Sequence, residues 1–279
     1  MCPEYDDPRF QRFCSACNQV RERHPSMTVG ALRTLLVIAA FDKVEGLTYE
    51  EVARETGLKY IQALHHIELL STGRSKQGGL GLVSRRDAAK GRITYSALSD
   101  LGKETVKLFA WVERDASHFE PVAVEIHTGV LPAITKALEF LPGISLGALA
   151  TFLQVGLMQR EIAFYGVSAK EIKERLNIAN VSRHLSILGN GLKKRDAKER
   201  GEKRPGYEVI EMIVSMEDSR VKLPELTDKG HKILFEIAKA VIGKEPTHPK
   251  RPKPELLENM ESPDEIDDLD DFGFDDLFE

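Results

Sequence analysis

The sequence has little cysteine and no long apolar run. Only three of its 279 residues are cysteine, Cys2, Cys14 and Cys17, and an odd number does not make a disulfide framework. No stretch approaches the ~20 consecutive apolar residues that a membrane-spanning helix requires. The acidic, polar start MCPEYDDPRF differs from a secretory signal. The sequence therefore predicts a cytoplasmic protein without a membrane partner.

The motifs of common enzymes are also missing. The sequence contains no phosphate-binding glycine loop, no HExxH motif, no paired catalytic carboxylates on a predicted element and no nucleophile with an evident base. Cys14 and Cys17 form a CxxC pair, but zinc sites usually need a second tight pair. We expect these cysteines to lie in a short amphipathic helix with Phe10 and Phe13, and zinc or redox use is the alternative. The sequence thus predicts a protein that is not an enzyme and binds no cofactor or metal.

The charge is unevenly distributed along the chain. The formal net charge is −5. However, residues 255–279 hold 12 of the 44 acidic residues and none of the 39 Lys and Arg, which leaves about +7 on residues 1–254. This asymmetry indicates a body that contacts polyanions and a tail with a separate task.

An internal repeat organises the chain. The segment VGALRTLL at 29–36 matches LGALATFL at 146–153, and each opens a stretch with helical apolar spacing. Each copy continues with a capping box, in which an N-cap hydroxyl is followed three residues later by a glutamate. These pairs are Thr48 with Glu51 and Ser168 with Glu171.

A turn, a second helix, a hairpin and a closing helix follow in each copy. The second helices are expected at 61–70 and 179–188, where Ala63, Ile67 and Leu70 align with Val181, Leu185 and Leu188. Gly81 and Gly191 are then paired as the glycines that precede two basic wings, 82–98 and a longer 192–226. The copies close on LSDLG at 98–102 and LTDKG at 226–230. This order predicts a mainly α (α+β) fold with two winged helix-turn-helix modules in tandem, joined by helices and followed by a disordered acidic tail.

These features resemble the MarR-type winged-helix regulators, closely in LTDKG and more loosely in LSDLG. The resemblance covers about residues 28–110 and 144–240, and implies a recognition helix in the major groove and a wing on the DNA backbone or minor groove. Family members usually carry one module and dimerise through terminal helices. Two modules in one chain therefore suggest an internal imitation of a dimer, with a homodimer as the alternative. The long second wing and the acidic tail depart from the family, so no ligand sensing is expected.

The domain boundaries follow from these segments. They are an N-terminal segment with the CxxC pair (1–25), the first module (26–110), a helical connector broken near Pro121 (111–143), the second module (144–242), a Pro- and Lys-rich linker (243–254) and the tail (255–279).

The candidate DNA contacts are donors on the second helices and cations of the wings, because DNA is a dense line of negative charge. Arg183 is the strongest single candidate, since an arginine can bridge two acceptors on a guanine. The first copy offers Lys59, Tyr60, Gln62, His65, His66, Arg74, Lys76, Arg85, Arg86, Lys90 and Arg92. The second offers Asn180, Ser182, Arg183, His184, Ser186, Lys193, Lys194, Arg195, Lys198, Arg200, Lys203 and Arg204.

The tail alternates acidic with apolar residues, among them Phe272, Phe274, Leu277 and Phe278. It resembles the acidic tails of bacterial and phage single-stranded DNA-binding proteins, although Glu279 ends it here. The resemblance implies docking on a partner protein and competition with DNA for the basic body. A tail that only confers solubility is the alternative.

The leading functional hypothesis is a transcription regulator of a phage or other mobile element that binds double-stranded DNA. The alternative is a phage or plasmid replication or recombination factor, because tandem winged helices also occur in plasmid replication initiators. Such a factor would bind DNA, single strands included, and recruit machinery through the tail. A module that contacts only protein is a third reading, against which the basic wings argue.

Overall fold

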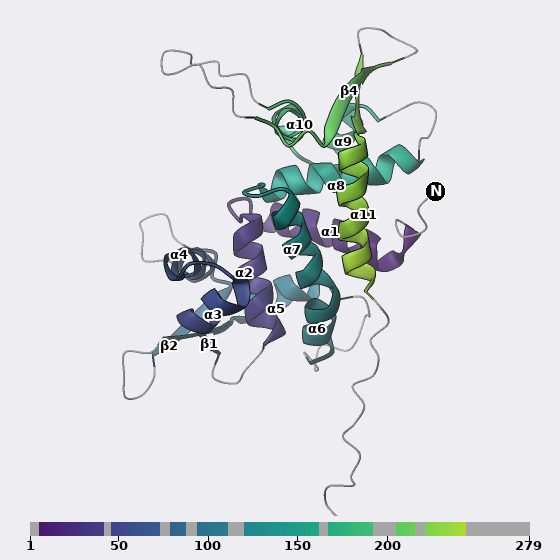
Figure 1. The fold of residues 1–279 in the computed structure, drawn as a ribbon. Helices are drawn as coiled ribbons and strands as arrows, with labels where there is room; N and C mark the ends of the chain where they lie inside the picture. The colour runs from purple at the N-terminus through teal and green to yellow at the C-terminus, as the bar shows by residue number, and fades with distance from the viewer. Residues whose placement is uncertain are drawn as a thin grey trace, which may run out of the picture. The chain divides into compact units, whose positions relative to one another are not determined.

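The chain is mainly helical, with two small antiparallel sheets (Figure 1). The computed structural model describes residues 6–41, 46–72, 79–87, 94–110, 120–161, 167–191, 205–215 and 221–243. The predicted mainly α, α+β class is confirmed. Among the described helices, none is long and apolar enough to cross a membrane.

The first copy of the repeat contains a three-stranded sheet in the order β1-β3-β2. Its elements are α1 (Pro8–Arg23), α2 (Val29–Ala40), β1 (Leu47–Thr48), α3 (Tyr49–Thr56), α4 (Tyr60–Leu70), β2 (Val83–Asp87), β3 (Thr94–Leu98) and α5 (Asp100–Lys107).

The second copy has the same order of helices and a two-stranded sheet, β4-β5. Its elements are α6 (Glu120–Glu125), the π-helical η2 (Ile126–Val130), α7 (Leu131–Phe140), α8 (Leu146–Glu161), α9 (Ala169–Leu176), α10 (Val181–Leu188), β4 (Ile210–Val214), β5 (Lys222–Leu226) and α11 (Asp228–Ile242).

The helical stretch from α6 to α7 begins beside one proline and passes through another. Pro121, near which the connector was expected to break, lies in the first turn of α6, where its missing N–H removes no hydrogen bond. Before Pro132 the helix widens into η2, and the N–H of Leu131 bonds the carbonyl of Ile126, five residues back.

Both predicted capping boxes are confirmed. The Glu51 N–H donates to Thr48 Oγ1 over 3.2 Å, and the Thr48 N–H donates to Glu51 Oε2 over 2.8 Å. Ser168 and Glu171 make the same pair of bonds, over 3.2 and 2.7 Å. After each box the helix ends on a residue with left-handed backbone, Gly57 (φ 63°) in the first copy and Asn177 (φ 50°) in the second.

In each copy, contacts among a glycine, a threonine and a histidine fix one helix to another: α4 to α2 in the first copy, and α10 to α8 in the second. Thr34 Oγ1 lies 3.1 Å from the Gly30 carbonyl and 2.9 Å from His66 Nδ1. A Cβ on Gly30 would lie 2.9 Å from His66 Cε1, so only glycine leaves room for the ring. Thr151, Gly147 and His184 repeat this arrangement in the second copy, with threonine contacts of 2.8 and 3.2 Å.

These three residues explain the GALxT pattern of the repeat, and they fix the register of the second helices. When His66 is aligned with His184, helices α4 and α10 align as predicted. All three predicted apolar pairs are then buried. The paired residues are Ala63 with Val181, Ile67 with Leu185 and Leu70 with Leu188.

The second hairpin begins later than predicted. Leu82 donates to the carbonyl of Leu70 over 2.7 Å, and Val209 donates to that of Leu188 over 2.8 Å. The residue before each has left-handed backbone, Gly81 with φ 69° and Glu208 with φ 57°. Gly81 therefore corresponds to Glu208 and not to Gly191, so the two hairpins are of almost equal length.

The prediction of a long, basic second wing is therefore wrong. Its seven cations precede β4 in the chain and lie outside the described residues: Lys193, Lys194, Arg195, Lys198, Arg200, Lys203 and Arg204.

The closing glycines bring each last helix against its hairpin. The Ser99 N–H donates to the Leu82 carbonyl over 3.0 Å, and the Thr227 N–H donates to the Val209 carbonyl over 3.1 Å. A Cβ on Gly102 would lie 2.0 Å from the oxygen of Leu82, and one on Gly230 would lie 2.1 Å from that of Val209. Close backbone approach thus requires the last residue of both LSDLG and LTDKG to be glycine.

The repeat extends further upstream than the sequence match at 29 and 146. His24 and Leu141 end α1 and α7 with nearly identical backbone angles, φ −132° and ψ 71° against φ −126° and ψ 64°. Met27 then donates to the His24 carbonyl over 2.9 Å, as Ile144 does to that of Leu141 over 3.1 Å. Helices α1 and α7 therefore occupy the same place in their copies.

The two copies exchange contacts through these leading helices. Helix α1 packs on α8 and α11 of the second copy, while α7 packs on α2 of the first and, more extensively, on α11 of its own copy. Thr28 and Ser145, the residues before α2 and α8, form an antiparallel bridge. Arg21 on α1 also donates to the carbonyl of Leu176 in the second copy. One continuous core results, and residues 1–243 form a single compact unit.

Cys14 and Cys17 lie on the buried face of α1, together with Phe10 and Phe13, as expected for an amphipathic helix. Burial raises the pKa of both thiols well above the ordinary value, because the thiolate would lose its solvation. In the described part of the chain, no group of three or more His, Cys, Asp or Glu could hold a metal ion.

We expect both thiols to resist a water-soluble disulfide reagent in the native protein and to react fully after denaturation in urea. Cys2 lies outside the described residues, so a Cys2→Ser variant removes its signal from the assay. Fast reaction of Cys14 or Cys17 in that variant without denaturant would contradict their burial.

Candidate nucleic-acid interface

Helix α4 buries one face and exposes the other. Tyr60 is 46% exposed and Ile61 is 67% exposed, and the side chain of His65 is 75% exposed. Lys59 and Gln62 are exposed beside them, and the side-chain Oε1 of Gln62 accepts the Lys59 N–H over 3.3 Å. Four of the five predicted recognition residues of the first copy therefore share a solvent-facing surface, although Gln62 also caps its own helix, while the fifth, His66, is half-buried against Thr34.

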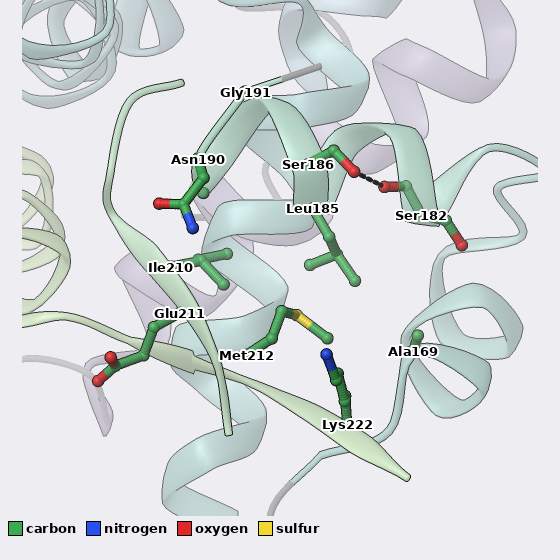
Figure 2. Close-up of a pocket in the computed structure, with 11 residues that line it drawn as sticks. Ala169, Ser182, Leu185, Ser186, Asn190, Gly191, Ile210, Glu211, Met212 and Lys222 are labelled. Carbon is green, nitrogen blue, oxygen red and sulfur yellow. Dashed lines mark hydrogen bonds between the residues drawn. The ribbon is translucent and has the colours of Figure 1, made fainter. Parts of the chain in front are cut away.

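Helix α10 presents a more polar surface at the equivalent place. Asn180, Ser182, Arg183 and Ser186 are exposed, and Ser186 Oγ donates to the Ser182 carbonyl over 2.9 Å (Figure 2). His184 was predicted to contact DNA, but its ring is directed at Thr151 and is half-buried. This histidine therefore anchors α10, and Arg183 is the exposed cation of the helix.

A groove lies between α10 and the β4-β5 hairpin (Figure 2). It encloses about 600 Å³, with Leu185, Ile210 and Met212 as apolar walls and Lys222 as its cation. Polar groups of Ser182, Ser186, Asn190 and Glu211 complete the lining.

The first copy has a groove at the equivalent place, with a volume of about 420 Å³, lined by Tyr49, by the residues just after α4 and by the hairpin. Each of its lining residues has a counterpart in the second groove when the helices and hairpins are aligned as above. The pairs are Tyr49 with Ala169, Ser71 with Gly189, Thr72 with Asn190, Val83 with Ile210, Ser84 with Glu211, Arg85 with Met212 and Thr94 with Lys222.

The two grooves differ in the position of their cation. Arg85 lies on β2 in the first copy, whereas Lys222 lies on β5 in the second. In place of Arg85, β4 exposes apolar residues, with Met212, Ile213 and Val214 at 43, 37 and 54% exposure. The first hairpin therefore presents an arginine where the second presents an apolar edge.

The sequence prediction missed Lys222, Thr94 and Asn190. The places of Lys222 and Thr94 in the grooves follow from the register of the hairpins, and the false pairing of Gly81 with Gly191 hid that register. Arg86 is placed in β2, opposite Tyr95, by its backbone alone. The remaining predicted cations of the first copy and the predicted partner-binding residues lie outside the described part of the chain: Arg74, Lys76, Lys90, Arg92, Phe272, Phe274, Leu277 and Phe278.

The anchoring histidines have lowered pKa values. Burial is the main cause for both His66 and His184, because it disfavours the imidazolium. Neighbouring cations lower the pKa further: His65 and Arg33 act on His66, and Arg21 and Arg183 act on His184. Both rings are thus held neutral while they contact threonine.

This shift predicts a loss of stability in mild acid. Below the ordinary histidine pKa of 6.5, the unfolded chain binds protons that the folded chain does not, so the free energy of unfolding falls as the pH decreases. Urea unfolding at pH 7 and pH 5.5 measures the loss. The double variant His66→Gln/His184→Gln should show a smaller dependence on pH, and an unchanged dependence would contradict this role.

Comparison of the chain with protein-family models, with characterised proteins and with solved structures found no match.

Proposed function

We propose that the chain binds double-stranded DNA through two winged helix-turn-helix modules and acts as a transcription regulator. One observation carries the proposal: each copy pairs an exposed helix, α4 or α10, with a hairpin, and a groove along the hairpin contains a cation, Arg85 or Lys222. A protruding helix fits the major groove, and a cation beside it can neutralise the phosphates that border that groove.

The exposed residues suit different tasks in such a complex. Arg183 can donate two parallel bonds to a guanine, while Asn180 and Gln62 carry amides that suit adenine. Arg85 and Lys222 lie in the grooves, where they would meet phosphate oxygens and set the position of each helix. The threonine–histidine contacts hold α4 and α10 rigidly, which limits the entropy lost on binding.

The test is the binding of fluorescent duplex and single-stranded DNA of equal length over a series of salt concentrations. We expect a preference for duplex and an affinity that falls steeply with salt, because each neutralised phosphate releases counterions. Equal or tighter binding of single strands would favour the replication or recombination factor. Binding of neither would overturn the proposal in favour of a module that contacts protein.

The tail adds a second measurement to this test. A chain ending at residue 254 loses 12 negative charges, so its net charge changes from −5 to about +7. We expect this chain to bind duplex more tightly at low salt, with the difference shrinking as salt screens the tail. Equal affinity of both chains at every salt concentration would contradict autoinhibition by the tail.

A further inference from the structure

The contacts between the copies are mutual. The leading helix of the first copy, α1, packs on α8 of the second, and the leading helix of the second, α7, packs on α2 of the first. Thr28 and Ser145 occupy equivalent places and pair with each other, antiparallel. A head-to-tail arrangement would join two different surfaces, whereas here the leading helix of each copy meets the equivalent helix of the other, α8 or α2, although α7 also packs extensively on α11 of its own copy. The copies are therefore related by an approximate two-fold axis that passes near Thr28 and Ser145.

The exposed faces of the two DNA-facing helices differ across this axis. With α4 and α10 aligned through their anchoring histidines, Gln62 corresponds to Asn180 and His65 to Arg183. Leu64, which is partly buried, corresponds to the exposed Ser182. The scaffold is thus nearly symmetric, while the residues that could contact bases are not.

We infer that one chain occupies a complete DNA site made of two half-sites, inverted with respect to each other and unlike in base sequence. The inference rests on the proposed function. Duplex DNA has local two-fold axes perpendicular to its length, so two modules related by a two-fold axis read inverted half-sites. Unlike side chains at equivalent positions then prefer unlike bases.

The unlike grooves also predict that the two half-sites differ in their contacts with the DNA backbone. The first half-site would be held by Arg85 on its hairpin, and the second by Lys222 on the opposite strand of the other hairpin. Arginine binds phosphate in a two-pronged geometry, and lysine binds it as a point charge. The two half-sites should therefore differ in phosphate contacts as well as in bases.

The experiment is selection of tight sites from a randomised duplex library with the full-length chain, followed by the mass of the complex on the selected site. We expect one chain per duplex and a site with two inverted, different half-sites. Direct repeats, a single half-site, or two chains on a perfect palindrome would overturn the inference while leaving duplex binding in place. Absence of duplex binding would overturn the proposed function itself.

A variant that makes α4 more like α10 gives a second test in the same site-selection experiment. In His65→Arg, α4 gains the arginine that α10 presents as Arg183, and the exposed position of His65 tolerates the larger side chain. We expect the first half-site to change toward the second, so that the selected site becomes more nearly palindromic. Circular dichroism checks the fold, and an unchanged selected site in a folded variant would contradict the assignment of this position to a base.

Discussion

Phe13→Ala is expected to lower the free energy of unfolding of both copies together, by about 3–5 kcal/mol. Phe13 is fully buried on α1, and its ring centroid lies 6.4 Å from that of Phe10 and 6.2 Å from that of Phe109. Phe109 follows α5 in the first copy, whereas α1 packs on α8 in the second. The cavity would therefore weaken the core that both copies share.

Urea unfolding followed by circular dichroism measures the loss, and hydrogen exchange followed peptide by peptide separates the copies. Gln11→Ala is the matched control, because Gln11 is exposed on the same helix and should change stability by no more than about 0.5 kcal/mol. A loss of protection confined to the first copy would show that the copies unfold independently and would contradict a shared core.

Arg183→Ala is expected to weaken binding to the selected duplex by about 1–3 kcal/mol, roughly a 5- to 150-fold rise in Kd, and to relax preference at one base pair. The guanidinium is exposed on α10, so its removal leaves the fold intact. Arg183→Lys retains the charge and loses the two-pronged geometry, and it should recover affinity for random duplex better than affinity for the selected site.

Binding isotherms on the selected site and on a random duplex measure both effects. Lys232→Ala on α11 is the control for charge, because Lys232 is an exposed cation outside α4 and α10. Equal losses for Arg183→Ala and Lys232→Ala would mean that net charge alone explains the effect, and would remove Arg183 from base recognition.

The helix-turn-helix pairs could be predicted from sequence because their determinants are local. A capping box and a left-handed turn residue act within a few positions, so Thr48, Ser168, Gly57 and Asn177 mark helix ends regardless of the rest of the chain. The closing motif is equally local, because the N-cap of α11 and Gly230 lie three residues apart.

The second hairpin could not be placed in this way. The left-handed position that glycine occupies in the first copy is Glu208 in the second, so the usual signal is missing. Gly191 offered a false signal ahead of the basic segment. Lys222 was missed as a consequence, since its place in the groove depends on the pairing of β4 with β5.

The exchange of α1 and α7 depends on contacts between residues far apart in the chain, which periodicity does not report. One signal was available nevertheless. Pro25 and Pro142 are separated by 117 positions, as are Gly30 and Gly147, so HPSMT and LPGIS extend the repeat to the ends of the leading helices.

The exchange has a consequence for how the chain is made. The apolar face of α1 is synthesised first, yet its partners α8 and α11 begin only at Leu146 and Asp228. During translation the part of α1 that packs on α8 and α11 must wait for those helices, whereas Phe13 can already meet Phe109 of the first copy, and closing so long a loop slows folding. In that interval α1 of one nascent chain can pair with α8 of another, and crowded polysomes would then yield intertwined dimers held by the same contacts that join the copies in one chain.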